Sequence, residues 1–334
     1  MAPDSQVPSP GGLVGVVVIG RNEGERLRRC FDSVVGAGRQ VIYVDSGSTD
    51  GSVRLAQSMG VETVALDLAT PFTAARARNA GFARLRSLQE SVDHVQFVDG
   101  DCEVAPQWIE QAVYFLAAQP AVAIVCGRRR ERFPERSVFN RLCDIEWTMP
   151  IGEIRACGGD ALMRVDAFEA VGGYNPSLIA GEEPELCVRL RQAQWKVWCL
   201  DAPMTLHDAA ILRWSQWWNR TKRAGHAFAE GAALHGAPPE CHWVAESRRA
   251  LAWGLGIPCA TLLACLLIDP HAFLLLAVYP AQVIRLAYHV PPEQPGRWAR
   301  AFFLVLGKFP EMLGAMRYFL HRGLHRPPVL IEYK

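Results

Sequence analysis

Two aspartates separated by one glycine, Asp99 and Asp101, are the residues best suited to chemistry in this sequence. They directly follow the apolar run HVQFV, so we expect them at the carboxyl end of a buried strand. Such a turn lets both carboxylates face one ligand, and Gly100 lets the backbone come close. Carboxylate oxygens hold Mg²⁺ or Mn²⁺, which neutralise a diphosphate group. Many such triplets are plain turns, but the preceding strand favours a metal site here.

Other polar residues follow the first apolar run, 13–20, or end the second expected strand, 40–48. Those that could contact a ligand are Arg21, Asn22, Glu23, Asp45 and Ser48. Asp45 can accept a hydrogen bond from a base ring N–H, and Arg21 can stack on a base or meet a phosphate. Asp50 is explained slightly better as a helix cap.

The later part of the chain adds a cation, two acids and a histidine. Arg78 lies on an expected helix, 72–88, where it could face the same edge. Glu182 and Glu183 open a helix expected over 181–195. A run of acids stabilises a helix N-terminus, but this explains Glu183 poorly. His207 is either a metal ligand, since neutral imidazole suits Mn²⁺, or a loop histidine.

Strands and helices alternate over the first 130 residues. This spacing predicts an α/β fold whose mostly parallel sheet has helices on both faces. Ligands bind beyond the carboxyl ends of such strands, where the acidic residues stand. The stretch from 128 to 180 is less regular, and we expect a charged loop or short helix at its start.

At this point the sequence resembles a family 2 glycosyltransferase with the GT-A fold, over about 14–208. The motifs that carry the resemblance are, in order, VVVIGRNEG, VDSGSTDGS, ARNAG, FVDGD, GGDALMRVDAFEAVGGYN and GEEPELCVRLRQAQW. The resemblance implies inversion at the sugar's anomeric carbon, with Asp45 on the base, Asp99 on the ribose or metal, and Asp101 on the metal. Gly159 and Asp160 would line the donor-sugar pocket, and UDP is favoured over GDP.

Two departures from the family pattern matter. The late motif reads Gly-Glu-Glu-Pro-Glu-Leu, so Glu183 stands where the family has its catalytic Asp. We favour Glu183 as the base and keep Glu182 as the alternative. The Q-x-x-R-W motif of many polymerising members is replaced by Gln216-Trp-Trp-Asn-Arg220, which argues against a processive synthase.

Charge and hydropathy set the domain organisation. Lys and Arg total 35 against 34 Asp and Glu, which does not indicate a nucleic-acid binder. The last third is basic and apolar, so we predict a soluble domain followed by a membrane-facing one. The boundaries that we expect are a disordered lead at 1–12, a catalytic domain at 13–210, an amphipathic interface helix and linker at 211–245, and a membrane-associated part at 246–334.

The segments 251–268 and 271–290 are each apolar enough to cross a bilayer, joined by Asp269-Pro270. Arginines flank the pair, which predicts an integral hairpin with both ends cytoplasmic. The segment 301–320 carries charges and is expected to lie in the interface. The alternative is that these are buried helices of a soluble domain or a dimer interface, and the sequence leaves the oligomeric state open.

The leading hypothesis is a metal-dependent inverting glycosyltransferase at the cytoplasmic membrane face. Its acceptor would be a lipid-linked or glycan hydroxyl. A nucleotidyltransferase is one alternative, although GRNEGE after the first strand is too acidic to cradle a triphosphate. A membrane scaffold with a degenerate domain is another, and the retained acids count against it.

Overall fold

The computed structural model describes residues 12–36, 38–326 and 329–332. The predicted disordered lead, 1–12, lies outside these ranges except for Gly12. The chain divides into two compact units. The first contains residues up to Phe133, Cys143–Ser177 and Glu182–Ala209, and the second contains Pro134–Leu142, Leu178–Gly181 and the chain from Ala210 onwards.

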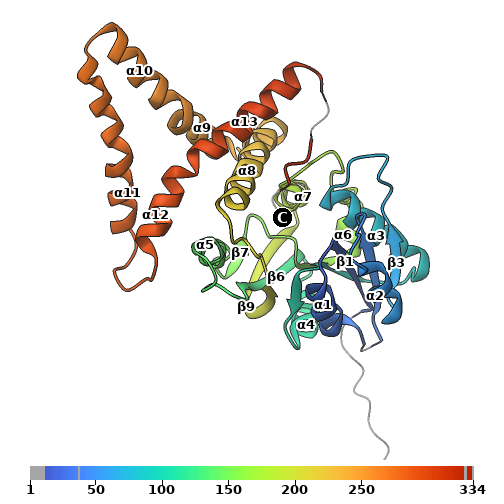
Figure 1. Cartoon of the computed structure of the whole chain (residues 1–334). Helices are drawn as coiled ribbons and strands as arrows, with labels where there is room; N and C mark the ends of the chain where they lie inside the picture. Colours follow the sequence, from blue (N-terminus) through green and yellow to red (C-terminus); the bar gives the residue numbers. More distant parts are fainter. Residues whose placement is uncertain (1–11, 37, 327–328, 333–334) are drawn as a thin grey trace, which may run out of the picture. The chain divides into compact units, whose positions relative to one another are not determined.

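One mixed sheet organises the first unit (Figure 1). Its strands are β1 (Val14–Gly20), β2 (Gln40–Asp45), β3 (Glu62–Ala65), β4 (His94–Asp99), β5 (Cys102–Val104), β6 (Val122–Glu131), β7 (Gly152–Ile154), β8 (Ala161–Arg164) and β9 (Lys196–His207). The order across the sheet is β3-β2-β1-β4-β8-β6-β9-β5, with β7 paired to β9. The first four strands in this order are parallel, as predicted, whereas β8 is antiparallel to both β4 and β6.

Helices cover both faces of the sheet, as predicted. Those of this unit are α1 (Glu25–Val34), α2 (Ser52–Ser58), α3 (Ala74–Leu88), α4 (Trp108–Ala118), α6 (Val165–Ala170) and α7 (Glu182–Gln192). Phe31 of α1 packs edge-on against Tyr43 of β2, with ring centroids 5.5 Å apart. Gly81 of α3 lies against Val44, the next residue of β2. Successive strand residues point to opposite faces, so α1 and α3 lie on opposite sides.

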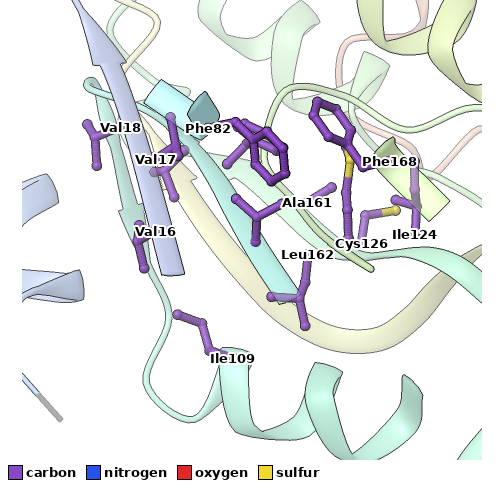
Figure 2. Packing of buried hydrophobic residues seen from close by; sticks show 14 of the residues in the cluster. Val16, Val17, Val18, Phe82, Ile109, Ile124, Cys126, Ala161, Leu162 and Phe168 are labelled. Carbon is purple, nitrogen blue, oxygen red and sulfur yellow. The ribbon is translucent and has the colours of Figure 1, made fainter. Parts of the chain in front are cut away.

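The core is apolar on both sides of the central strands, and Figure 2 shows part of it. Val16, Val17 and Val18 of β1 have no exposed surface. A parallel strand covered on both faces needs this continuous apolar run, which is why β1 could be located from its sequence. The rigid sheet fixes the positions at which β1, β2 and β4 end.

Helices form the second unit among the described residues. They are α8 (Trp214–His235), α9 (Val244–Leu251), the π-helical η1 (Ala252–Gly256), α10 (Ile257–Leu267), the 3₁₀-helical η2 (Pro270–Ala277), α11 (Val278–Tyr288), α12 (Arg297–Leu306) and α13 (Lys308–Gly323). In addition, α5 (Val138–Glu146) begins in this unit and ends in the first.

The predicted single helix at 301–320 is wrong in detail. The chain forms two helices instead, α12 and α13, with Gly307 between them. A Cβ at Gly314 of α13 would collide with the backbone oxygen of Lys222, so α13 packs closely on α8. Sequence hydropathy did not reveal this contact because glycine carries no apolar side chain to mark it.

Two apolar helices in succession occupy the segments of the predicted hairpin, whose insertion into a membrane stays a prediction. Val244–Leu267 and Pro270–Tyr288 are long and apolar enough to cross a membrane, with mean hydropathies of 2.0 and 1.3. In Figure 1 the chain runs out along α10 and returns along α11. The Asp269 side chain accepts a hydrogen bond from the His271 backbone N–H at 2.7 Å and caps the second helix. The exposed leucines near the turn include Leu266 and Leu267.

Candidate active site

The Asp99-Gly100-Asp101 turn stands where β4 ends and β5 is about to begin. The Gly100 backbone N–H donates to the Ile19 carbonyl at 2.8 Å. A Cβ at Gly100 would lie only 3.1 Å from that oxygen, so a larger residue would crowd the turn against β1. The parallel register pairs Ile19 with Asp99 and Gly20 with Asp45. Asp45 and Asp99 therefore reach the same edge of the sheet, as predicted.

His207 lies beside Asp101, although 106 positions separate them in the chain. His207 is the last residue of β9, and antiparallel pairing with β5 sets it opposite Cys102. Its Nε2 is 3.0 Å from Asp101 Oδ2. Both side chains are buried. β9 runs from Lys196 to His207, so this histidine belongs to the sheet and not to a loop.

Arg78 of α3 joins the acids of β4 to those of α7. Its Nη2 donates to Asp99 Oδ1 at 2.8 Å, and its Nη1 lies 2.9 Å from both Glu182 Oε1 and Glu183 Oε1. Arg78 is 2% exposed. A guanidinium held by three carboxylates is already engaged, and the sequence pattern predicted its position but not these partners. Its neighbour Asn79 turns away and bonds the backbone of Tyr174.

The two glutamates of α7 differ in environment. The Glu182 side chain is 5% exposed and the Glu183 side chain 14%. Burial and the adjacent Glu182 charge raise the pKa of Glu183 to about 7, although Arg78 opposes the rise. A carboxyl group with this pKa can accept a proton near neutral pH. By contrast, Arg78 and Arg129 hold the pKa of Asp99 below its usual range even though burial acts in the opposite direction.

Arg129 is a site residue that sequence reasoning missed. It lies on β6, where its Nη2 is 3.1 Å from Asp99 Oδ2 and 2.7 Å from Asp160 Oδ2. Asp160 also accepts bonds from the Asp99 backbone N–H at 3.0 Å and from the Thr205 hydroxyl at 2.9 Å. Asp160 is therefore a buried brace for the Asp99 turn.

Gly159 lies directly behind the acidic cluster. A Cβ at this position would be 2.3 Å from Arg78 Nη2 and 3.0 Å from both Asp99 Oδ2 and Glu183 Oε1. The absence of a side chain at Gly159 thus leaves room for these three groups to meet. The predicted role of Gly159 and Asp160 in a donor-sugar pocket stays a prediction.

Asp45 forms a turn at the end of β2. Its Oδ2 accepts from the backbone N–H groups of Gly47 and Ser48, each at 2.9 Å, and its Oδ1 accepts from the Tyr43 hydroxyl. The Ser48 hydroxyl accepts from the Asn22 N–H at 2.9 Å, which ties this turn to the end of β1. Asp50 accepts from the Ser52 and Gly24 N–H groups, but Gly51 holds the N-cap position of α2, so Asp50 precedes the cap position that we favoured for it.

The remaining predicted residues also stand at the end of β1. The Arg21 guanidinium lies over the Phe72 ring at 4.6 Å from its centroid, and Glu23 pairs with Arg26 at 2.7 Å. Base or phosphate contacts by Arg21, Asn22, Glu23, Asp45 and Ser48 stay predictions.

The residues at this edge fit a divalent cation. Ligand atoms of Asp101, Cys102 and His207 lie within 4.8 Å of one another. Burial and neighbouring acids raise the pKa of the Cys102 thiol well above its usual value, so the sulfur stays protonated and is a poor ligand. This leaves the carboxylate of Asp101 and the imidazole of His207, a donor set that suits Mn²⁺.

Comparison with known families identifies the domain that carries this edge. Residues 15–171 match the model of glycosyl transferase family 2. These residues form a glycosyl transferase family 2 domain. The matched range contains β1 to β8, and therefore the Asp99-Gly100-Asp101 turn and Gly159. Membership confirms the expected family and favours an enzyme over a degenerate scaffold.

The fold is shared with a solved structure of this class. The mannosyltransferase PcManGT from Pyrobaculum calidifontis, solved with GDP-Man and Mn²⁺, superimposes with a TM-score of 0.62. The match covers 95% of this chain and 90% of that chain at 19% identity, and so it supports the GT-A fold alone.

Two curated relatives match the catalytic part of this glycosyltransferase. The succinoglycan biosynthesis protein ExoA of Rhizobium meliloti is 28% identical over 53% of this chain and 55% of its own length. The glycosyltransferase AglE of Haloferax volcanii is 25% identical over 55% of this chain and 63% of its own. The matches thus span little more than half the length of these relatives.

Proposed function

We propose that this family 2 glycosyltransferase moves a sugar from a nucleoside diphosphate donor to an acceptor hydroxyl, with inversion and with Mn²⁺ or Mg²⁺. The observation that carries the proposal is the convergence of Asp99, Asp101 and His207 with the Glu182-Glu183 pair at one sheet edge. Asp101 and His207 would hold the metal, with Asp99 beside them. The bound metal neutralises the charge that develops on the departing diphosphate.

The proton of the acceptor hydroxyl would pass to Glu183. Its side chain is more exposed than that of Glu182, and its raised pKa suits a base at neutral pH. Arg78 holds both glutamates and Asp99, so it orients the base relative to the acidic turn. Asp45 and Ser48 would meet the nucleoside, since they stand at the end of the neighbouring strand.

We keep UDP as the preferred donor nucleotide, as the family resemblance implied, and GDP as the competitor. The solved mannosyltransferase with the same fold carries GDP-Man. Both nucleotides therefore belong in the first screen.

We propose that the reaction takes place at the cytoplasmic face of a membrane, on a lipid-linked or membrane-proximal glycan acceptor. The two apolar helices, Val244–Leu267 and Pro270–Tyr288, would form an integral hairpin. Arg248 and Arg249 lie near its start and Arg297 and Arg300 follow its end, and positive charges at the ends favour the cytoplasmic side.

The test uses the full chain purified in detergent. Thermal shift with UDP, GDP and dTDP plus Mn²⁺ identifies the nucleotide, and hydrolysis of the matching sugar donors is then followed with and without EDTA. We expect one nucleotide to raise Tm only with metal, and EDTA to abolish hydrolysis. Metal-independent binding and turnover would exclude the proposed metal role.

A further inference from the structure

Trp147 contacts two residues, His207 and Arg129, that pair with the aspartates of the Asp99-Gly100-Asp101 turn. Its ring stacks on the His207 imidazole, with centroids 4.5 Å apart and planes 22° from parallel. The guanidinium carbon of Arg129 lies 5.2 Å from the centroid of the same Trp147 ring. A stacked pair and a cation–π contact are both orientation-dependent, so Trp147 restricts how each partner can lie.

These two partners are the groups that bond the two aspartates of the turn. His207 Nε2 faces Asp101 Oδ2 at 3.0 Å, and Arg129 Nη2 faces Asp99 Oδ2 at 3.1 Å. Trp147 thus touches one partner of each carboxylate. Replacing the Trp147 ring should therefore disturb the positions of both Asp99 and Asp101, although it removes no atom that could bind a metal.

The backbone of Trp147 is itself fixed. Trp147 follows directly after α5, and its N–H donates to the Cys143 carbonyl at 2.9 Å, which continues the helical turn. Cys143 is 2% exposed. The indole is therefore carried by an anchored segment and can act as a firm support for the imidazole.

We propose that Trp147 is a positioning residue for the metal site, which holds the His207 imidazole with Nε2 directed to the place of the cation. This inference rests on the proposed function, because it takes Asp101 and His207 as metal ligands. Groups that orient a metal-ligating histidine typically change metal affinity about 10–100-fold when they are removed. The effect should appear in metal binding itself and not only in turnover.

The experiment measures Mn²⁺ affinity of the full chain in detergent, by the electron paramagnetic resonance signal of free Mn²⁺. We expect Trp147→Ala and Trp147→Leu to raise Kd about tenfold or more. Trp147→Phe keeps a ring that can stack, and should stay within about threefold of wild type. If the alanine variant does not fold, the comparison of leucine with phenylalanine decides.

Trp198→Ala is the matched control. Trp198 lies on β9, the strand of His207, but its ring packs on Phe115 of α4 with centroids 5.6 Å apart. It should lower Tm and leave Kd for Mn²⁺ unchanged. If Trp147→Leu lowers Tm and also keeps the wild-type Kd, Trp147 is merely structural and the inference is overturned. If wild type binds no Mn²⁺, the proposed metal site fails, and the inference fails with it.

Discussion

Arg78 Nη1 lies 2.9 Å from Glu183 Oε1, and the Arg78 side chain is almost wholly buried. The same nitrogen is 2.9 Å from Glu182 Oε1. One cation thus orders two adjacent carboxylates, of which Glu183 is nearer to solvent. This arrangement assigns the two glutamates different expected roles, which mutation can separate.

Glu183→Gln should lower transfer about 10²- to 10⁴-fold, because a general base typically contributes that much. Donor affinity should change little, since the base acts on the acceptor in the transition state. Glu182→Gln should mainly disturb the pairing with Arg78 and lower stability. Acceptor-dependent turnover and nucleotide binding are measured for both variants. If Glu182→Gln shows the selective loss of transfer and Glu183→Gln stays active, the base is Glu182.

The pH dependence of transfer should show an acidic limb near pH 7. The pKa of Glu183 is raised to about 7 by burial and by Glu182, and a base works only when deprotonated. Below that pH, kcat/KM for the acceptor should fall about tenfold per unit. An unperturbed glutamate would place the limb near its usual value of about 4.3 instead. A profile that stays flat down to pH 5 would contradict the assignment.

Asp101→Asn should lower metal-dependent turnover about 100-fold or more, because a catalytic metal supplies several kcal/mol of charge stabilisation. Nucleotide binding in the presence of Mn²⁺ should weaken as well. Asp166→Asn on α6 is a control acid outside the proposed metal-binding residues. Mn²⁺-dependent nucleotide binding at wild-type strength in the Asp101 variant would remove Asp101 from the metal site.

Asp45, Asp99 and Asp101 could be predicted because each ends or follows an apolar strand whose pattern is visible in the sequence. Arg129 could not, because β6 continues from its apolar half into Arg128, Arg129 and Arg130. Strand alternation turns Arg129 inward while its neighbours stay more exposed, and a charged run hides that alternation. Only a prediction that extended this strand beyond its apolar half would have marked Arg129 as a strand residue.

Trp147 lay beyond sequence reasoning for another reason. Its contact with His207 joins positions 60 residues apart, and neither spacing nor composition marks it. The antiparallel direction of β8 could not be predicted either, because local periodicity identifies a strand but does not show whether it runs parallel to its neighbours. Gly314 shows the same limit in the helical unit, where a close helix contact has no apolar signature.

Glu230→Gln should stabilise the protein at pH 8 and change it little at pH 5. Burial raises the pKa of Glu230 to about 7, with His226 Nδ1 3.5 Å away. An acid whose folded pKa is raised loses stability as pH rises from its unfolded pKa to its folded one, because only the unfolded chain gives up the proton freely. Above pH 7 the cost amounts to a few kcal/mol, at about 1.4 kcal/mol per pKa unit. Tm is compared at both pH values, and an equal shift at each would contradict the raised pKa.

The hairpin should anchor the full chain in membranes through its exposed leucines. Leu262 and Leu263 of α10 are 60% and 56% exposed, and they lie five and four residues before the end of the first apolar helix. An Asp costs about 2.5–3.5 kcal/mol at the bilayer centre and less towards the interface, so the double change Leu262→Asp and Leu263→Asp should weaken insertion through the sum of the two costs. Tyr114→Asp, at a 69% exposed position of α4 in the first unit, is the control.

Membranes are washed with carbonate, and the pellet is compared with the supernatant. We expect wild type and the Tyr114 variant to stay in the pellet while the double variant is released. A truncation before α9 is a poor test, because it also removes α13, which packs on α8. If wild type stays soluble after high-speed centrifugation without detergent, the hairpin does not span a membrane.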